Sequence, residues 1–176
     1  PPATEPSPAS YQDYATVSPR GIFFRIPEGV DPVAVIAFGC ALPTAIGGMR
    51  RLGGIQPGQS VVVQGCGPVG LATTMLAALS PARQVIVIGA PDHRLAAAQR
   101  LGATRTVPLE TTTPDERLAI VRDATEGRGA DVVLECAGRT EAFGEAMQML
   151  DPNGAAVLLG LFSGHGTVEL DPFRLN

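Results

Sequence analysis

Short apolar runs alternate with helical patterns along most of this chain. The run Val85–Ile88 has no polar alternation, as expected for a parallel strand that is covered on both faces. Strands that alternate with helices predict an α/β fold, a doubly wound parallel sheet with right-handed crossovers and strand order 3-2-1-4-5. We expect the sixth strand of such a fold to be missing. The expected strands are Val61–Gln64, Val85–Ile88, Thr106-Val107, Asp131–Glu135 and Ala155–Leu161.

Capping residues and stop residues mark the expected helices. Asp31-Pro32 has the form of an N-cap followed by proline at the first helical position. Thr113-Pro114-Asp115-Glu116 has the form of a capping box. The helices predicted from such signals cover Pro32 to Ala37, Leu42 to Leu52 with a stop at Gly53-Gly54, Pro68 to Leu79, Asp92 as cap to Leu101 with a stop at Gly102, Pro114 to about Gly127, and a last one from about Thr140.

Apolar spacing also predicts which helix faces point inward. Leu42, Ile46, Met49 and Leu52 lie three or four residues apart, and so do Phe143, Met147 and Leu150. Asp151–Gly154 is expected to be a turn. Upstream, Pro1 to Ser10 is a Pro/Ser-rich tail, and Tyr11–Val17 and Ile22–Ile26 have the character of strands without an obvious sheet to join.

Composition excludes several classes of function. The 176 residues are 45% hydrophobic and 17% charged, which predicts a single globular domain rather than a disordered chain. A net charge of −4 argues against sequence-independent nucleic-acid binding. No run is long and apolar enough to span a membrane. The three cysteines are widely spaced, so we expect a reducing cytoplasmic location rather than a disulfide framework.

A glycine-rich turn follows the first predicted strand. Gly65, Gly67 and Gly70 form a G-x-G-x-x-G pattern between an apolar strand and an apolar helix, with Pro68 at the helix start. In a dinucleotide site the first glycine allows a sharp turn, the second lets pyrophosphate approach, and the third allows tight helix packing. The helix N-terminus then faces the phosphates. This context favours a dinucleotide-binding (Rossmann) fold over an ordinary strand-to-helix turn.

The residues after the second strand bear on which nicotinamide cofactor is bound. NAD sites carry an acid there that grips the ribose 2′-hydroxyl, and this chain has Gly89-Ala90-Pro91 instead. The first carboxylate afterwards, Asp92, is expected to be a helix N-cap. Arg94 could pair with a 2′-phosphate, although it could equally be a solvated helix residue. The sequence therefore favours NADP over NAD slightly.

The residues give no complete metal site. Cys40 lies among apolar residues, where a lone cysteine is usually buried and inert. A zinc site needs three or four ligands, and His93 and His165 are not spaced as its partners. Neither zinc coordination nor any catalytic side chain can be assigned from these residues alone.

Several motifs in register resemble the zinc-type medium-chain dehydrogenase/reductase family of alcohol, sorbitol and threonine dehydrogenases. They are Gly39–Ala45, Gly58, Val61–Gly70, Leu101–Thr104 and Gly129–Glu135. The resemblance covers about residues 22–176 and implies the cofactor-binding domain of such an enzyme. Residues 1–21 would then be a Pro-rich tail and a remnant of the catalytic domain, and we expect the chain to be a fragment.

The resemblance also implies roles for single residues. Cys40 takes the place of the zinc ligand that the cofactor domain contributes, and Thr44 lies where the family contacts nicotinamide. The pyrophosphate loop corresponds to Gly65, Gly67, Pro68, Val69 and Gly70, whereas Ala137 and Leu161 lie where the family lines the nicotinamide pocket. Gly89, Ala90 and Arg94 occupy the ribose end. Family members that use NADP also have glycine at position 89, but they usually follow it with Ser and Arg.

Three functions share these features. The first is part of a zinc-dependent enzyme that moves hydride between NAD(P) and a small alcohol or carbonyl substrate. The second is a nucleotide-binding or regulatory module without catalysis. The third is a methyltransferase that binds S-adenosylmethionine, but that reading predicts an acid at the end of the second strand, where Gly89 stands. An open sheet edge would favour a homo-oligomer.

Overall fold

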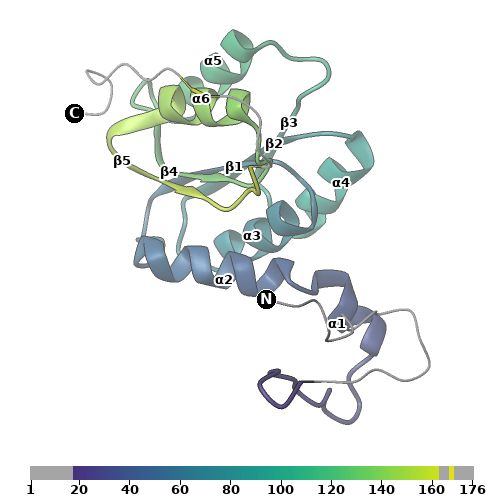
Figure 1. Cartoon of the computed structure of the whole chain (residues 1–176). Helices are drawn as coiled ribbons and strands as arrows, with labels where there is room; N and C mark the ends of the chain where they lie inside the picture. The colour runs from purple at the N-terminus through teal and green to yellow at the C-terminus, as the bar shows by residue number, and fades with distance from the viewer. Residues whose placement is uncertain (1–17, 163–166, 169–176) are drawn as a thin grey trace.

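The computed structural model describes residues 18–162 and 167–168. Within them a five-stranded parallel sheet has the order β3-β2-β1-β4-β5, which confirms the predicted fold class and strand order (Figure 1). Its strands are β1 (Ser60–Gln64), β2 (Gln84–Gly89), β3 (Arg105–Pro108), β4 (Ala130–Glu135) and β5 (Leu150–Leu158). The helices are α1 (Pro32–Phe38), α2 (Ala41–Leu52), α3 (Pro68–Ala78), α4 (Asp92–Arg100), α5 (Pro114–Ala124) and α6 (Thr140–Met149).

Helices cover both faces of the sheet, as its apolar strands require. Alternate residues of β1 show the division, because Val61 and Val63 belong to one buried cluster and Val62 belongs to the other. Helices α2, α3 and α4 cover the first face, and α5 and α6 cover the second (Figure 1). Burial on both faces explains why the central strands have no polar alternation.

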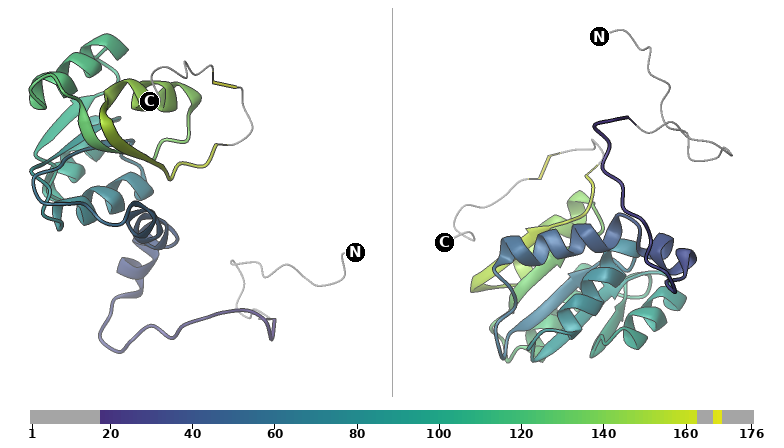
Figure 2. Two further views of the ribbon diagram at one scale, coloured as in Figure 1. Left: turned by 90° about the vertical axis from the view of Figure 1, so that its left-hand side faces the viewer. Right: turned by 90° about the horizontal axis from the view of Figure 1, so that it is seen from below.

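The segment that precedes α1 is not a strand. Ile22, Phe23 and Phe24 are 86%, 77% and 88% exposed, and the segment runs away from the sheet (Figure 2). The predicted strand Ile22–Ile26 is therefore wrong, because an apolar run forms a strand only where a neighbouring strand accepts its hydrogen bonds. The predicted tail Pro1–Ser10, the predicted strand Tyr11–Val17 and His165 lie outside the described residues.

The fifth strand differs from its predicted bounds. Ala130 pairs with Leu150 and Val132 pairs with Ala155, so residues 151–154 form an irregularity within β5 rather than a separate turn. The strand ends at Leu158 instead of Leu161. Its end has a clear cause, because the backbone N–H groups of Leu159 and Gly160 both donate to the Glu135 carbonyl, at 2.7 and 2.9 Å.

Two predicted inner helix faces are only partly correct. The buried residues of α2 are Ala41, Ala45 and Gly48, whereas Ile46 is exposed. Small residues lie at this contact because it is close: a Cβ on Gly48 would lie 2.6 Å from Leu159 Cδ2. In α6 the buried residues are Ala146 and Met149. The predicted residues Phe143 and Met147 are half-buried, and Leu150 already belongs to β5.

The helix signals are confirmed except at α4. Asp31 caps α1 by accepting the Val33 N–H, and Thr113 with Glu116 forms the predicted capping box of α5. At α4 the N-cap is Pro91, whose carbonyl accepts the N–H groups of Arg94 and Leu95 at 2.9 and 3.3 Å. Asp92 is instead the first helical residue, so its prediction as N-cap is wrong.

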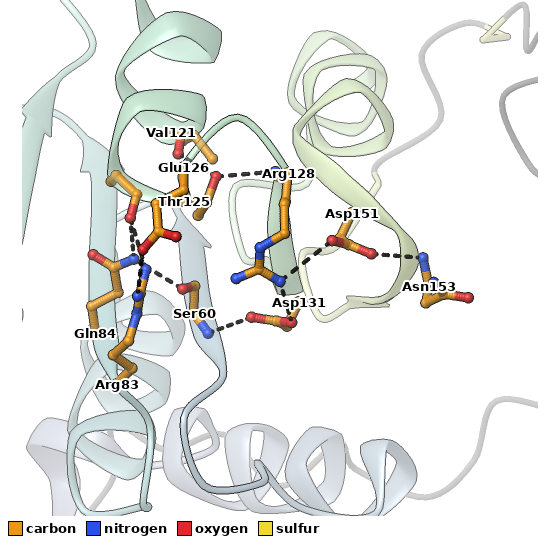
Figure 3. Close-up of polar contacts among 12 residues, drawn as sticks. Ser60, Arg83, Gln84, Val121, Thr125, Glu126, Arg128, Asp131, Asp151 and Asn153 are labelled. Atoms are coloured by element: carbon orange, nitrogen blue, oxygen red, sulfur yellow. Dashed lines mark hydrogen bonds and ion pairs between the residues drawn. The ribbon is translucent and has the colours of Figure 1, made fainter.

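A network of polar contacts joins the strands at their amino ends (Figure 3). The Asp131 carboxylate accepts the Ser60 N–H at 2.7 Å, and Arg128 reaches Asp131 at 4.0 Å and Asp151 at 3.7 Å. Gln84 donates to Ser60 Oγ at 2.9 Å. These contacts connect β1, β2, β4 and β5 at one edge of the sheet, and they leave the opposite, carboxyl edge open for a ligand.

In the described ranges, no single helix is long and apolar enough to cross a membrane, and only the bent pair α1 and α2 passes that test when taken together.

We expect Asp131→Ala to lower the free energy of unfolding by about 2 kcal/mol, because the substitution leaves the buried Ser60 N–H without an acceptor. Asp123→Ala is the matched control, since Asp123 pairs with Arg105 at 3.7 Å on the surface and should matter by less than about 1 kcal/mol. Urea denaturation of both variants measures the difference. Equal losses would contradict the role of the network.

Candidate functional site

The glycine turn between β1 and α3 is shaped by three different steric conditions. Gly65 has a φ of +97°, which side chains rarely adopt, and its N–H donates to the Ile88 carbonyl at 2.7 Å. A Cβ on Gly70 would lie 1.9 Å from the Gly65 carbonyl oxygen, so α3 can pack here only without a side chain. A Cβ on Gly67 would meet nothing within 4 Å. The backbone of Gly67 is thus open toward the space where a ligand would approach.

The helix that follows presents free N–H groups at its start. Gly67 is the N-cap of α3 and has no side chain to cap it, and Pro68 occupies the first turn. Because the first N–H groups of a helix have no partner within it, an anion placed there gains hydrogen bonds and a favourable dipole interaction. The geometry is that of a phosphate-binding turn.

A cavity of about 600 Å³ opens beside this turn at the carboxyl ends of β1, β2 and β4. This is the position where the order of the strands reverses, between β1 and β4, and where open α/β sheets bind ligands. Six of the residues predicted from the sequence line it together: Gly65, Gly67, Gly89, Ala90, Arg94 and Ala137.

The other predicted residues lie outside the lining of this cavity. Pro68, Val69 and Gly70 form the first turn of α3. Thr44 lies in the first turn of α2, where its hydroxyl donates to the Cys40 carbonyl at 2.8 Å. Leu161 is 87% exposed, but its backbone lies against Gly138, since a Cβ there would be 2.5 Å from the Leu161 carbonyl oxygen. The chain segments after β4 and β5 are therefore neighbours.

Cys40 is exposed, which corrects the expectation that it is buried. It is the N-cap residue of α2, at the bend between α1 and α2. Among the described residues, no group of three or more His, Cys, Asp and Glu side chains could hold a metal ion. The described residues thus do not fit a complete zinc site, and Cys40 could serve only as one ligand of several.

The cavity also has a charged wall that sequence reasoning missed. Arg117 is buried at the start of α5 and contacts both carboxylate oxygens of Glu145 on α6, at 2.6 and 2.9 Å. A third bond joins Arg117 to the Thr112 carbonyl. Arg117 lies four residues before Val121, on the inward face of α5. That spacing is the signal in the sequence from which its inward position could have been predicted. The pair holds α5 and α6 together behind the ligand space.

The three arginines of the cavity differ in how far they are neutralised. Arg117 is matched by Glu145, and Arg139 lies 3.8 Å from Glu141. Arg94 makes no ion pair with any side chain in the part of the chain that the structure describes. Its charge is consequently the one in this wall most available to an anionic ligand.

Two thiols line the cavity, and both are held in the protonated state. Burial raises the pKa of the Cys136 thiol to about 12, although a hydrogen bond with Thr73 opposes the rise. Burial likewise raises the pKa of Cys66. Because the thiolate is the nucleophile, neither thiol is suited to covalent catalysis at neutral pH.

A buried glutamate positions the two turns beside the cavity. Glu135 ends β4, and its Oε1 accepts the N–H groups of Ala137 and Gly138, both at 2.7 Å. Its backbone carbonyl accepts Leu159 and Gly160 in addition. The side chain is fully buried, and this burial raises the pKa of its carboxyl despite the N–H donors around it.

A family model described as zinc-binding dehydrogenase matches residues 68–176. Among curated relatives, 5-exo-hydroxycamphor dehydrogenase of Pseudomonas putida is 42% identical over 170 residues, which are 97% of this chain and 47% of that protein. The chain thus spans about half the length of the curated relatives it matches.

Solved structures agree with this match. An alcohol dehydrogenase from Thermotoga maritima superposes with a TM-score of 0.80 at 30% identity, covering 86% of this chain and 41% of that one. A protein described as a zinc-binding dehydrogenase from Sinorhizobium meliloti 1021, solved with NADP bound, gives a TM-score of 0.73 at 31% identity. That comparison covers 86% of this chain and 43% of the other.

The raised pKa of Glu135 predicts a pH-dependent stability. A carboxyl whose pKa is higher in the folded state than in the unfolded state contributes to the free energy of unfolding. This contribution is fully present below the unfolded pKa and is lost as pH rises through the folded pKa. Glu135→Gln keeps an acceptor oxygen and removes the charge. We therefore expect the stability of this variant relative to wild type to increase as pH rises from about 4 to 7.

Urea unfolding at a series of pH values measures this effect, with the exposed Glu141→Gln as its control. A Glu135→Gln variant whose pH profile parallels that of wild type would show that the buried carboxyl does not titrate in this way.

Proposed function

This chain belongs to the zinc-binding dehydrogenase family, in which it corresponds to the NAD(P)-binding domain, and on that premise we propose the role of each part of its site. The domain binds a nicotinamide dinucleotide with the pyrophosphate on the turn from Gly65 to Gly70. It serves an enzyme that moves hydride between this cofactor and an alcohol or carbonyl. The family match, which covers residues 68–176, supports this proposal.

The observation that carries the proposal is the contrast between Gly67 and Gly70. One glycine faces open space and the other is closed by the Gly65 carbonyl at 1.9 Å. A turn that served packing alone would need only the second. An uncrowded backbone next to free helix N–H groups, at the edge of a cavity of about 600 Å³, suits a diphosphate.

We propose NADP as the preferred cofactor. The ribose end of the cavity has Gly89 and Ala90 where NAD sites carry an acid, so these two positions hold no carboxylate that would repel a 2′-phosphate. Arg94 lines the same space and carries a charge that no described acidic side chain pairs. The NADP-bound relative from Sinorhizobium meliloti 1021 is compatible with this choice.

Zinc remains a proposal for the intact enzyme, in which Cys40 would be one ligand. The metal would polarise the oxygen of the substrate. The residues of this chain would do other work: the glycine turn binds the diphosphate, and Thr44, Ala137 and Leu161 border the nicotinamide. The backbone contact of Gly138 with Leu161 supports placing the last two at one pocket.

A nucleotide-binding module without catalysis is the alternative. It predicts the same glycine turn, because fold alone does not determine function. Gene sequence upstream of Pro1 separates the two, since an enzyme requires a preceding domain with further Cys or His ligands. A cytosolic location and self-association through the edge strand β5 remain predictions; the free thiols of Cys40, Cys66 and Cys136 suit the first.

Calorimetry with NADPH, NADH and S-adenosylmethionine tests the proposed ligand. We expect both nicotinamide nucleotides to bind and S-adenosylmethionine to fail. Gly67→Ala should weaken NADPH binding by about tenfold or more, because a methyl group keeps the diphosphate from the N–H groups. It should cost less than about 1 kcal/mol of stability.

Gly70→Ala is the contrasting variant, and it should lower stability by about 3 kcal/mol because its methyl group meets backbone. Undiminished NADPH binding by Gly67→Ala, or binding of S-adenosylmethionine alone, would contradict the proposal.

The preference for NADP is tested at Arg94. Arg94→Gln should weaken NADPH binding by about tenfold and leave NADH binding nearly unchanged, because only NADPH carries the 2′-phosphate. Arg100→Gln provides the control, since Arg100 is an exposed arginine in the last turn of the same helix. Titrations at one ionic strength compare the variants. Equal losses for the two nucleotides would mean that Arg94 does not recognise the 2′-phosphate.

A further inference from the structure

The space beside position 89 is already occupied by another side chain. Gly89 ends β2, where it is buried and its carbonyl accepts the Leu109 N–H at 2.8 Å. A Cβ on Gly89 would lie 2.5 Å from Cys66 Sγ and 3.1 Å from both Cβ and N of Cys66. These three atoms of Cys66 are the nearest neighbours of that position, so any side chain at 89 must displace Cys66.

Cys66 is held in this place from two sides. It is the residue between Gly65 and Gly67, and its thiol donates to the Ala90 carbonyl at 3.2 Å. The side chain is 2% exposed and packs in the same apolar cluster as Val63, Val87 and Leu95. A thiol that is both hydrogen-bonded and enclosed cannot turn away without losing contacts on both sides.

We propose that Cys66 is a specificity-determining residue, whose thiol fills the volume that a carboxylate side chain at position 89 would need. This inference rests on the proposed function of the cavity as a nicotinamide-nucleotide site. The glycine turn and the end of β2 then act together. By excluding an acid from position 89, Cys66 leaves the 2′ position of the ribose to Arg94.

The charges of the cavity agree with this assignment. Its two lining carboxylates, Glu141 and Glu145, lie beside Arg139 and Arg117 respectively. Neither is paired with Arg94. Arg94 is thus the one arginine of this wall that no described acid neutralises. An acid at position 89 would place a carboxylate near Arg94, and Arg94 would then no longer attract a phosphate.

A double-mutant cycle in the 176-residue chain tests the steric contact without any ligand. Gly89→Ala should lower Tm by about 5 °C in the wild-type background, because its methyl group collides with the thiol. In the Cys66→Ala background the same substitution should lower Tm clearly less. Cys136→Ala is the matched control, since this second thiol of the cavity is not among the nearest neighbours of position 89. Equal costs in all three backgrounds would overturn the proposal.

Titrations with NADH and NADPH test the consequence for specificity. Gly89→Asp alone should weaken NADPH binding without improving NADH binding, because the aspartate cannot reach its place. Gly89→Asp with Cys66→Ala should bind NADH about tenfold more tightly than Gly89→Asp alone, which is the gain expected from one accommodated hydrogen-bonding group.

The outcomes separate this inference from the proposed function. If wild type binds neither nucleotide, the proposed function fails and the inference fails with it. If wild type binds NADPH but Gly89→Asp binds NADH equally well with and without Cys66, only the inference about Cys66 is overturned.

Discussion

The contact between helix α3 and the turn before it is the constraint on which the rest of this domain depends. A Cβ on Gly70 would lie 1.9 Å from the Gly65 carbonyl oxygen, so the helix starts directly against the end of the strand. That closeness points the first N–H groups of α3 at the end of β1. In the same turn Gly65 has a positive φ, and Gly67 lies uncovered at the edge of the cavity.

The two ends of the sheet are built in different ways, and the difference locates the site. At the amino end, Asp131, Arg128 and Ser60 join neighbouring strands through hydrogen bonds and ion pairs. At the carboxyl end the strands diverge into turns, and Glu135 holds two of these turns through its side chain and its carbonyl. Because the amino end is fixed and the strands remain in register, the carboxyl end of the sheet can be followed by turns with irregular backbone.

The charged and thiol side chains of the cavity differ in what they can contribute. Both thiols of the cavity are protonated by burial, and Cys40 has no described partners with which to hold a metal. The charges are arranged accordingly: Arg117 serves the packing of α5 on α6, whereas Arg94 stays available. These features suit the cofactor-binding role proposed above.

Local chemistry was enough to predict most of the fold from the sequence. Val61–Gln64 and Val85–Ile88 are apolar without interruption, so they had to be covered strands, and Thr113 with Glu116 could only begin a helix. The glycine spacing likewise predicted the turn with Gly65 and Gly67. The end of the second strand pointed to Gly89, Ala90 and Arg94, and only the family resemblance pointed to Ala137; all six line the cavity. Two of the predictions that failed depended on contacts distant in the sequence. Ile22–Ile26 has no neighbouring strand, and β5 ends where Glu135 captures its backbone.

The sequence by itself therefore determined the order of elements and the glycine turn, because each follows from neighbours within one helical turn or one strand. The alternation of strands and helices predicted the sheet topology as well, through the rule of right-handed crossovers. Only the tertiary structure decided which charges are neutralised and which side chains share space. Arg117 meets Glu145 across 28 positions, and Cys66 meets position 89 across the β1–β2 edge. Such contacts depend on how elements far apart in the sequence pack together, and no local pattern of residues predicts that packing.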